Sequence, residues 1–266
     1  MNLLLNISEI AIITGDNPYK TKRDYLLDFW KKNAKNDFLK YQQLTQYTKV
    51  TDDDIIKKIS SNNNIDLSTE LKKCNKINNI SDLDTMKNEI FKKIENLNEI
   101  EKDEITKSIK NVTNTKFGIR NEDDVTKLYE NMTGNSITKD NKYYKIKLFE
   151  FNDINVYIGG KIDGINETGS IIEVKNRVNK LFYELRPYEK VQIMCYMHLF
   201  NTKEGHLVEA LKKSNTSINI IKVEYDEEYI NYIIDKIKVF AIFFKEFVHN
   251  HDMKIDIMQN NIEIDF

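Results

Sequence analysis

The chain has 266 residues, of which 40% are hydrophobic and 31% charged, enough to bury one substantial core or two small ones. Its formal net charge of −2 gives no overall basic field, so affinity for nucleic acid would require a local patch. Two cysteines, Cys74 and Cys195, are too few for a disulfide framework or a cysteine-based zinc site, and they favour a reducing, intracellular setting. We expect no signal peptide and no membrane span, because residues 1–13 lack a basic start and no apolar run approaches ~18 residues.

The first elements expected are two helices. Residues 8–15 predict a short helix with Ser8 as N-cap and Gly15 at its C-terminal stop. Residues 21–35 predict an amphipathic helix with an aromatic-rich apolar side. Taken alone, the two patterns are typical of ordinary packing helices.

Residues 41–116 differ in amino-acid composition from the rest of the chain. They are rich in Asn, Lys, Asp, Glu and Ile and contain neither glycine nor proline. Within residues 82–97, apolar side chains recur at spacings of three and four, as on one face of a helix. We therefore predict a mostly helical insertion, either a solvated decoration or an arm that clamps DNA or binds a partner.

A further helix is expected to begin near Asn121, within residues 118–134. Acidic residues, Glu122 among them, occupy its first turn, where they complement the helix dipole. An apolar stripe at Val125, Leu128 and Met132 follows. An early glutamate of this kind is more often a dipole partner than a catalyst.

Strands dominate the middle of the chain. Residues 143–151 and 154–158 alternate and favour Tyr, Ile, Val and Phe, with a tight turn between them at Asn152 and Asp153. We expect the next strand to end at Asp163, and a turn at residues 166–170 to lead into a strand over residues 171–175.

The alternation of that last strand predicts a polar site. Ile172 and Val174 should point to one face, and Glu173 and Lys175 to the other, because side chains alternate with period two. A hairpin would then bring Asp163, Glu173 and Lys175 into one pocket. Carboxylate oxygens suit Mg²⁺, and a neighbouring lysine can orient or help deprotonate a water. Together these groups could carry out metal-assisted hydrolysis of a phosphodiester. The alternative is a solvated outward face, since this pattern alone is weak.

The residues that follow add positive charge and a closing set of elements. Arg177 and Lys180 lie beside the expected site and either contact a phosphate or belong to a solvated loop. Residues 188–200 predict an amphipathic helix that contains Gln192. Strands at 207–211 and 218–225, a long helix at 226–249 and a tail at 251–266 complete the prediction.

Three motifs together resemble a known family. The spacing D-(x)9-E-V-K from Asp163 resembles the PD-(D/E)xK nuclease signature. The segment S-E-I-A-I-I-T-G-x-N-P-Y-K-T from Ser8 is similar to the start of the YqaJ-like viral recombinase family, relatives of phage lambda exonuclease. The pattern G-x3-E-x2-V-x3-Y-x3-TG from Gly118 matches that family's G-x3-E-x2-A-x3-Y-x3-TG. The resemblance covers about residues 8–30 and 118–248.

The resemblance implies a role for each polar site residue. Asp163, Glu173 and the Val174 carbonyl would hold Mg²⁺, with Mn²⁺ as an alternative, and Lys175 would position the attacking water. Glu122 would enter the metal site directly or through water, and Gln192 would hydrogen-bond near the lysine. Ser8 would contact a 5′-phosphate. The family's upstream arginine is missing, so Lys20, Lys22 or Arg23 would have to supply its charge.

The fold class expected is α/β, a PD-(D/E)xK restriction-endonuclease-like core with a mixed central sheet flanked by helices. The core would comprise residues 1–40 and 117–250, with a helical insertion at 41–116 and a tail at 251–266. We expect an intracellular, Mg²⁺-dependent DNA nuclease, an exonuclease acting on duplex DNA ends in recombination or end processing. Its location would be the cytoplasm, or a host cell if the source is viral. The family implies a single-strand annealing partner and ring-forming homo-oligomers. A structure-selective endonuclease or resolvase, or a non-catalytic DNA- or protein-binding scaffold, remains an alternative.

Overall fold

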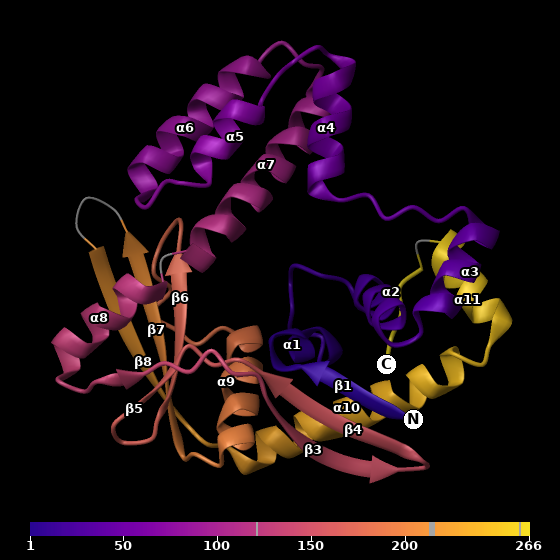
Figure 1. Cartoon of the computed structure of the whole chain (residues 1–266), viewed down its shortest axis with the longest axis vertical. Helices are drawn as coiled ribbons and strands as arrows, with labels where there is room; N and C mark the ends of the chain where they lie inside the picture. Colours follow the sequence, from indigo (N-terminus) through magenta and orange to yellow (C-terminus); the bar gives the residue numbers. More distant parts are fainter. Residues whose placement is uncertain (121, 213–215, 261) are drawn as a thin grey trace.

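The computed structural model describes residues 1–120, 122–212, 216–260 and 262–266, and the side chains of these except residues 118–120, 122, 123, 212 and 216. Figure 1 shows a helical arm at the top, a strand-rich body below it and a small group of helices at the right, near both chain termini. None of the helices in the described ranges is long and apolar enough to cross a membrane.

The strands form two mixed sheets within the described residues. One sheet has the order β1-β4-β3 and the other β2-β5-β6-β7-β8; the pairs β1–β4 and β6–β7 are parallel and the other pairs antiparallel. The expected mixed α/β class is therefore correct, with two sheets in place of one. The strands are β1 (Asn2–Asn6), β2 (Ile137–Thr138), β3 (Tyr144–Phe151), β4 (Ile154–Gly160), β5 (Gly164–Asn166), β6 (Ile171–Arg177), β7 (Glu204–Lys212) and β8 (Thr216–Glu224).

Helices cover both sheets and form the arm. Helix α9 contacts β4, β6 and β7 and so joins the two sheets, and α10 runs along the lower edge of the body. The helices are η1 (Ile7–Glu9, a 3-10 turn), α1 (Ile10–Ile13), α2 (Lys22–Asn33), α3 (Lys35–Thr45), α4 (Asp52–Asn62), α5 (Ser68–Cys74), α6 (Ile80–Lys93), α7 (Glu99–Arg120), α8 (Glu122–Thr133), α9 (Pro187–Phe200), α10 (Glu227–Phe247) and α11 (His251–Gln259).

The start of the chain differs from the sequence-based expectation. Residues 2–6 form β1, which pairs in parallel with β4 and buries Leu3 and Leu5. Ser8 lies inside the 3-10 turn η1, whose N-cap is Asn6, so the prediction that Ser8 caps a helix is wrong. The helix that follows has only four residues and ends before Gly15, whose φ of +85° suits glycine. Its brevity means that it provides no helix-dipole site for an anion.

The central hairpin is displaced by a few residues from its expected place. Strand β4 ends at Gly160 and β5 begins at Gly164, so Asp163 lies in the link between them and does not end a strand. The Lys161 carbonyl in this link accepts a hydrogen bond from the Tyr196 hydroxyl at 2.6 Å. This bond from α9 holds the link in place beside the sheet.

The faces of β6 follow the predicted alternation. Ile172 and Val174 pack in a small cluster with Val125 and Tyr129 of α8, whereas Ile171 belongs to the main core on the other side. Glu173 and Lys175 share the side of Ile171, which is the side covered by α9. The sheet therefore separates an apolar face from the face that carries the polar site.

The main core is built largely from aromatic and branched side chains of α2, α9 and α10. Phe29 of α2 meets Phe240 and Phe244 of α10 edge-on, with ring centroids 5.2 and 4.8 Å apart. The C-terminal segment joins this core through Ile257, Met258, Ile264 and Phe266 in α11 and beyond. Residues 251–266, expected as a tail without readable structure, thus contribute one helix and several buried side chains.

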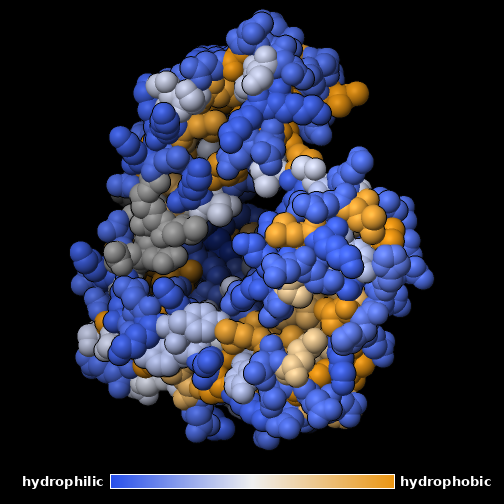
Figure 2. All heavy atoms as spheres, turned by 45° about the vertical axis from the view of Figure 1, so that its right-hand side comes forward, coloured by the Kyte–Doolittle hydropathy of each residue, from blue (hydrophilic) through white to orange (hydrophobic). Residues whose placement is uncertain are grey.

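The arm has a core of its own. Buried side chains of α4, α5, α6 and α7 form a separate cluster, and Val178 and Leu211 of the body pack against it. The helical periodicity noted over residues 82–97 corresponds to α6 at Ile80–Lys93. Figure 2 shows a hollow between the arm above and the body below, and its depths are hydrophilic.

Candidate active site

The polar residues of β6 line an open cavity of about 420 Å³. Segments that are far apart in the sequence meet at its walls: the first turn of the chain, the link between β4 and β5, strand β6 and helix α9. Six of the residues singled out in the sequence lie there together, namely Ser8, Asp163, Glu173, Val174, Lys175 and Gln192.

The position of Asp163 is set by the backbone of the neighbouring strand. Its Oδ2 accepts a hydrogen bond of 2.7 Å from the Val174 backbone N–H. Because the pairing of Gly164 with Ile172 fixes the register of β5 on β6, the Asp163 carboxylate is placed beside the start of the E-V-K segment. Asp163 and Glu173 thus reach one cavity although ten positions separate them.

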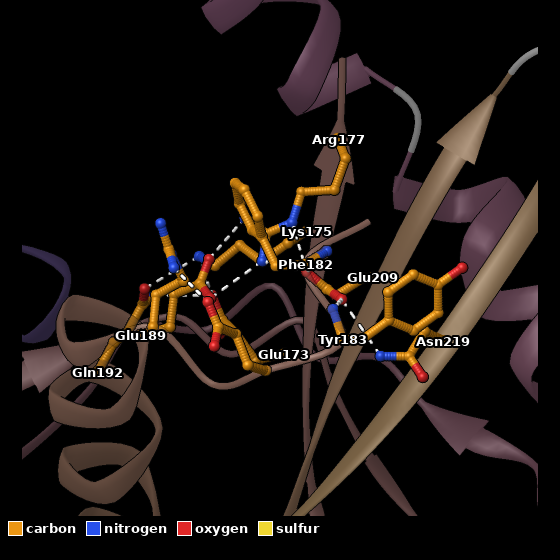
Figure 3. A network of polar contacts seen from close by, with 11 residues as sticks. Glu173, Lys175, Arg177, Phe182, Tyr183, Glu189, Gln192, Glu209 and Asn219 are labelled. Carbon is orange, nitrogen blue, oxygen red and sulfur yellow. Dashed lines mark hydrogen bonds and ion pairs between the residues drawn. The ribbon is translucent and has the colours of Figure 1, made fainter. Parts of the chain in front are cut away.

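Glu173, Lys175 and Gln192 form a closed triangle of hydrogen bonds. The Lys175 ammonium donates to Glu173 Oε1 at 2.8 Å and to Gln192 Oε1 at 3.0 Å, and Gln192 Nε2 donates to Glu173 Oε1 at 2.7 Å. Figure 3 shows the three side chains converging from β6 and α9. Each member restrains the other two, so the three side chains are held in position by contacts within the protein.

Burial sets the electrostatics of this triangle. Only 4% of Glu173 is exposed, and this burial raises its pKa to about 7, with a further contribution from the charge of Asp163, although Lys175 acts in the opposite direction. Burial alone would lower the pKa of Lys175, but the charges of Glu173 and Asp163 outweigh it and raise that pKa. Lys175 is therefore an ammonium at neutral pH, suited to orienting a water or stabilising negative charge rather than to accepting a proton.

The donor set fits a hard divalent cation. Two carboxylates, Asp163 and Glu173, face one cavity. The raised pKa of Glu173 shows that its negative charge is not fully compensated within the protein, and a bound cation would supply the missing positive charge. Among the described side chains, no three His, Cys, Asp or Glu gather closely enough to hold a metal by themselves. Backbone carbonyls, water or substrate oxygens would complete the coordination, as is usual for Mg²⁺.

Tyr196 is a site residue that the sequence interpretation missed. It follows Gln192 by four residues on α9, so the two side chains share one helical face, and both line the cavity. Its hydroxyl holds the Lys161 carbonyl, and a Cβ added at Gly160 would lie only 2.8 Å from that hydroxyl oxygen. The i, i+4 spacing from Gln192 was the available signal. Tyr196 thus positions the link that carries Asp163.

Arg177, expected beside the site as a possible phosphate contact, is held in a buried ion-pair network. It is 9% exposed, and its guanidinium bonds Glu189 Oε1 at 2.7 Å and Glu189 Oε2 at 3.0 Å, and Glu209 Oε1 at 2.7 Å. Burial opposes its charge, but both carboxylates outweigh that effect and raise the pKa of Arg177 above its usual range. Because its guanidinium is bonded to both Glu189 and Glu209, Arg177 ties α9 to β6 and β7 (Figure 3).

The remaining candidates lie outside the triangle. Lys20 pairs with Glu9 at 3.2 Å and with Asp28 at 2.9 Å, so its charge is already engaged. Lys180 is exposed on the segment after β6, with its ammonium 6.0 Å from the centroid of the Phe182 ring. Glu122 begins α8, but its side chain lies outside the described residues, and its role stays a prediction.

The pKa of Glu173 predicts how Mg²⁺ affinity depends on pH. Below about pH 7 a proton on Glu173 competes with the cation, and above it the carboxylate is ionised. We expect the apparent affinity, measured by calorimetry or by the Mg²⁺-induced rise in Tm, to be about tenfold weaker at pH 6 than at pH 8. Glu173→Gln should lose both the affinity and this pH dependence. Equal affinity at the two pH values would contradict a pKa of about 7 for Glu173, and unchanged affinity in Glu173→Gln would exclude Glu173 as a ligand.

Comparisons with known proteins give distant structural likenesses. No family model matches the chain, and no curated protein matches it. The chain is similar to an alkaline exonuclease (LHK-Exo) from Laribacter hongkongensis, with 16% identity over 51% of this chain and 70% of that chain and a TM-score of 0.42. It is similar to a phage-related exonuclease from Haemophilus somnus 129PT, with 11% identity over 94% of this chain and 96% of that chain and a TM-score of 0.43. Likeness at this level leaves the chemistry to be argued from the residues of this chain.

Proposed function

We propose that the chain is a Mg²⁺-dependent nuclease that hydrolyses phosphodiester bonds of DNA at the cavity of Asp163, Glu173 and Lys175. The observation that carries this proposal is the closed Glu173–Lys175–Gln192 triangle beside a second carboxylate that the Val174 N–H holds. Two carboxylates and an ammonium lie in one open, polar cavity. This arrangement suits a reaction in which a bound cation and a lysine both stabilise negative charge on the same phosphate. The open cavity beside the triangle leaves room for a substrate, whereas the fully buried Glu189 and Glu209 around Arg177 have a structural role.

Each residue of the site has a separate role in the proposed reaction. Asp163, Glu173 and the Val174 carbonyl would hold the cation, which when bound supplies positive charge beside the scissile phosphate and lowers the pKa of water. Lys175, fixed by two acceptors, orients the attacking water and stabilises charge that develops on the phosphate. Gln192 holds both partners in register, and Tyr196 keeps the link that carries Asp163 against α9.

Local charge supports a polyanionic substrate. Although the chain as a whole has a net charge of −2, residues 20–49 contain eight Lys or Arg and only three Asp or Glu. Several of these lysines, Lys31, Lys32, Lys35 and Lys40 among them, are exposed on α2 and α3. A basic region of this kind attracts phosphate backbones and makes the affinity fall with salt. The action on DNA ends, the place in recombination and an annealing partner belong to this proposal through the family resemblance.

A cleavage assay on three forms of DNA tests the proposal. Linear duplex, nicked circular and covalently closed circular DNA are incubated with the full chain in Mg²⁺ and, separately, in excess chelator. We expect degradation of linear DNA in Mg²⁺ only, with closed circles resistant. Cleavage of closed circles would favour the endonuclease alternative. Absence of cleavage of every form, with Mg²⁺ or Mn²⁺ present, would exclude the nuclease.

Ser8 gives a prediction about the chemistry of the DNA end. Its exposed side chain lines the cavity that contains Lys175, so its hydroxyl can donate to a terminal phosphate there. A hydrogen bond to a charged group is worth ~1.5–3 kcal/mol, which corresponds to roughly tenfold or more in rate. We expect linear DNA with 5′-phosphate ends to be degraded about tenfold faster than DNA with 5′-hydroxyl ends, measured by product release. Ser8→Ala should narrow this difference; an unchanged ratio would remove Ser8 from end recognition.

A further inference from the structure

The segment between β6 and α9, residues 178–186, presents an exposed aromatic ring close to the site. It connects the strand that carries Lys175 with the helix that carries Gln192. Its side chains differ widely in exposure: Leu181 is buried, whereas Tyr183 is 71% exposed. Exposure alone does not mark a functional residue, because single exposed apolar side chains are common; the backbone of Tyr183 adds a second observation.

The backbone of Tyr183 is firmly anchored although its ring is exposed. Glu209, which is fully buried, accepts the backbone N–H of Phe182 at 3.3 Å and that of Tyr183 at 3.0 Å. The same carboxylate accepts from Arg177 Nε and from Asn219 Nδ2, at 2.7 and 3.2 Å. A buried, four-way acceptor thus fixes the peptide units on both sides of Phe182 (Figure 3).

The ring of Phe182 helps to hold the segment in place. The guanidinium carbon of Arg177 lies 4.5 Å from the ring centroid, and that of Arg186 lies at the same distance. Two cations therefore pack on Phe182, and its ring stiffens the segment rather than meeting a ligand. Tyr183 is the residue whose ring this anchored segment exposes to solvent.

The conformation of Tyr183 is costly for its residue type. Its φ is +60°, in the left-handed region that glycine adopts freely and bulky L-residues rarely do. A glycine or asparagine would satisfy the same backbone bonds without that cost. Packing does not explain the tyrosine, because its side chain is mostly exposed. Strain of this kind, held by a buried network beside a reactive centre, indicates a function for the side chain.

The strand register places the segment relative to the catalytic lysine. Lys175, Glu209 and Asn219 are register partners on β6, β7 and β8, so they form one row across the sheet. With strands about 4.8 Å apart, Asn219 lies about 10 Å from Lys175 along this row. Figure 3 shows Tyr183 beside Asn219, with Glu173 and Gln192 at the other side of Glu209. At about 3.4 Å per nucleotide of one strand, this span corresponds to about three nucleotides.

We infer that Tyr183 stacks on a nucleobase of the DNA substrate, within about three nucleotides of the phosphate that is cleaved. The inference rests on the proposed function and adds a base-contacting position to it. A tyrosine face stacks on any of the four bases, so the contact holds the strand without reading its sequence. Stacking on one aromatic residue changes affinity by about tenfold.

Binding in a cleavage-deficient protein tests the contact. Fluorescently labelled linear DNA is titrated with three proteins: the Asp163→Asn parent, and the same protein with Tyr183→Phe or Tyr183→Gly added. We expect Tyr183→Phe to bind like its parent and Tyr183→Gly to bind about tenfold more weakly, while its Tm is equal or higher because glycine relieves the strain. The matched control is Tyr232→Ala, an aromatic 43% exposed on α10, which should change nothing.

DNA that lacks single bases identifies the partner of the ring. A series of duplexes, each with one abasic site within three nucleotides of the cleavage position, is bound by both Tyr183 and Tyr183→Gly proteins. At one abasic position the parent should bind about tenfold more weakly than it binds intact DNA. Tyr183→Gly, which already lacks the ring, should show no further loss of affinity at that position. If Tyr183→Gly binds intact DNA as tightly as the parent, or weakens equally at every abasic position, the inference is wrong. It then fails alone if the wild-type chain still cleaves DNA, whereas absence of Mg²⁺-dependent cleavage overturns the proposed function itself.

Discussion

Replacement of Asp163 by asparagine should reduce the rate of DNA cleavage by on the order of 10²–10³-fold or more. The amide keeps the shape and still accepts the Val174 N–H bond, so the hairpin stays folded, but the charge that the cation requires is removed. Glu173→Gln should lose cleavage to a similar extent for the same reason. Rates are compared on 5′-phosphorylated linear duplex at saturating Mg²⁺, with Tm recorded for each variant.

The control for these variants is Asp153→Asn. Asp153 occupies the tight turn between β3 and β4 with a φ of +61°, a conformation that asparagine accepts readily. The substitution removes one carboxylate from the surface of the chain and should leave the cleavage rate unchanged. Cleavage by folded Asp163→Asn at the rate of Asp153→Asn would refute the assignment of the site.

Replacement of Arg177 by methionine should cost about 3–5 kcal/mol of unfolding free energy. The change leaves two fully buried carboxylates, Glu189 and Glu209, without their cation. For a chain of this size, the loss corresponds to a fall in Tm of about 6–20 °C.

Arg186→Met provides the matched control for Arg177. Arg186 packs on Phe182 at the same 4.5 Å distance, but its side chain is 40% exposed and its ion pair is with the exposed Glu184. Its loss should cost under about 1 kcal/mol, as for surface ion pairs. Adding Glu189→Gln and Glu209→Gln to Arg177→Met should recover much of the stability. A Tm for Arg177→Met equal to that of Arg186→Met would show that the buried network contributes little.

The polar face of β6 was predictable because period-two alternation is a local property. Glu173 and Lys175 had to share one face, and a hairpin had to bring Asp163 near them, whichever residues exactly ended the strands. The helical nature of the arm was likewise visible in the spacing of apolar residues. Such patterns depend on neighbours in the sequence, which is why the sequence reveals them.

The identity of the partners was not predictable in the same way. Arg177 followed the motif like a free cation, but the residues that neutralise it lie 12 and 32 positions later, on α9 and β7. Strand β1 has too few residues for a distinct pattern, and its parallel partner lies about 150 positions away. The strain at Tyr183 arises from Glu209 on another strand. Each of these features depends on long-range pairing, which a single sequence does not show.

Anomalous diffraction from crystals of the full chain soaked in Mn²⁺ tests most directly whether these residues form one cation-dependent centre. We expect a peak in the 420 Å³ cavity, within about 2.0–2.3 Å of oxygens from Asp163, Glu173 and the Val174 carbonyl, and its loss in Asp163→Asn. Lys175 should remain bonded to Gln192 beside it. A wild-type crystal that shows no peak in this cavity at saturating Mn²⁺, or a peak held by other residues alone, would contradict the account.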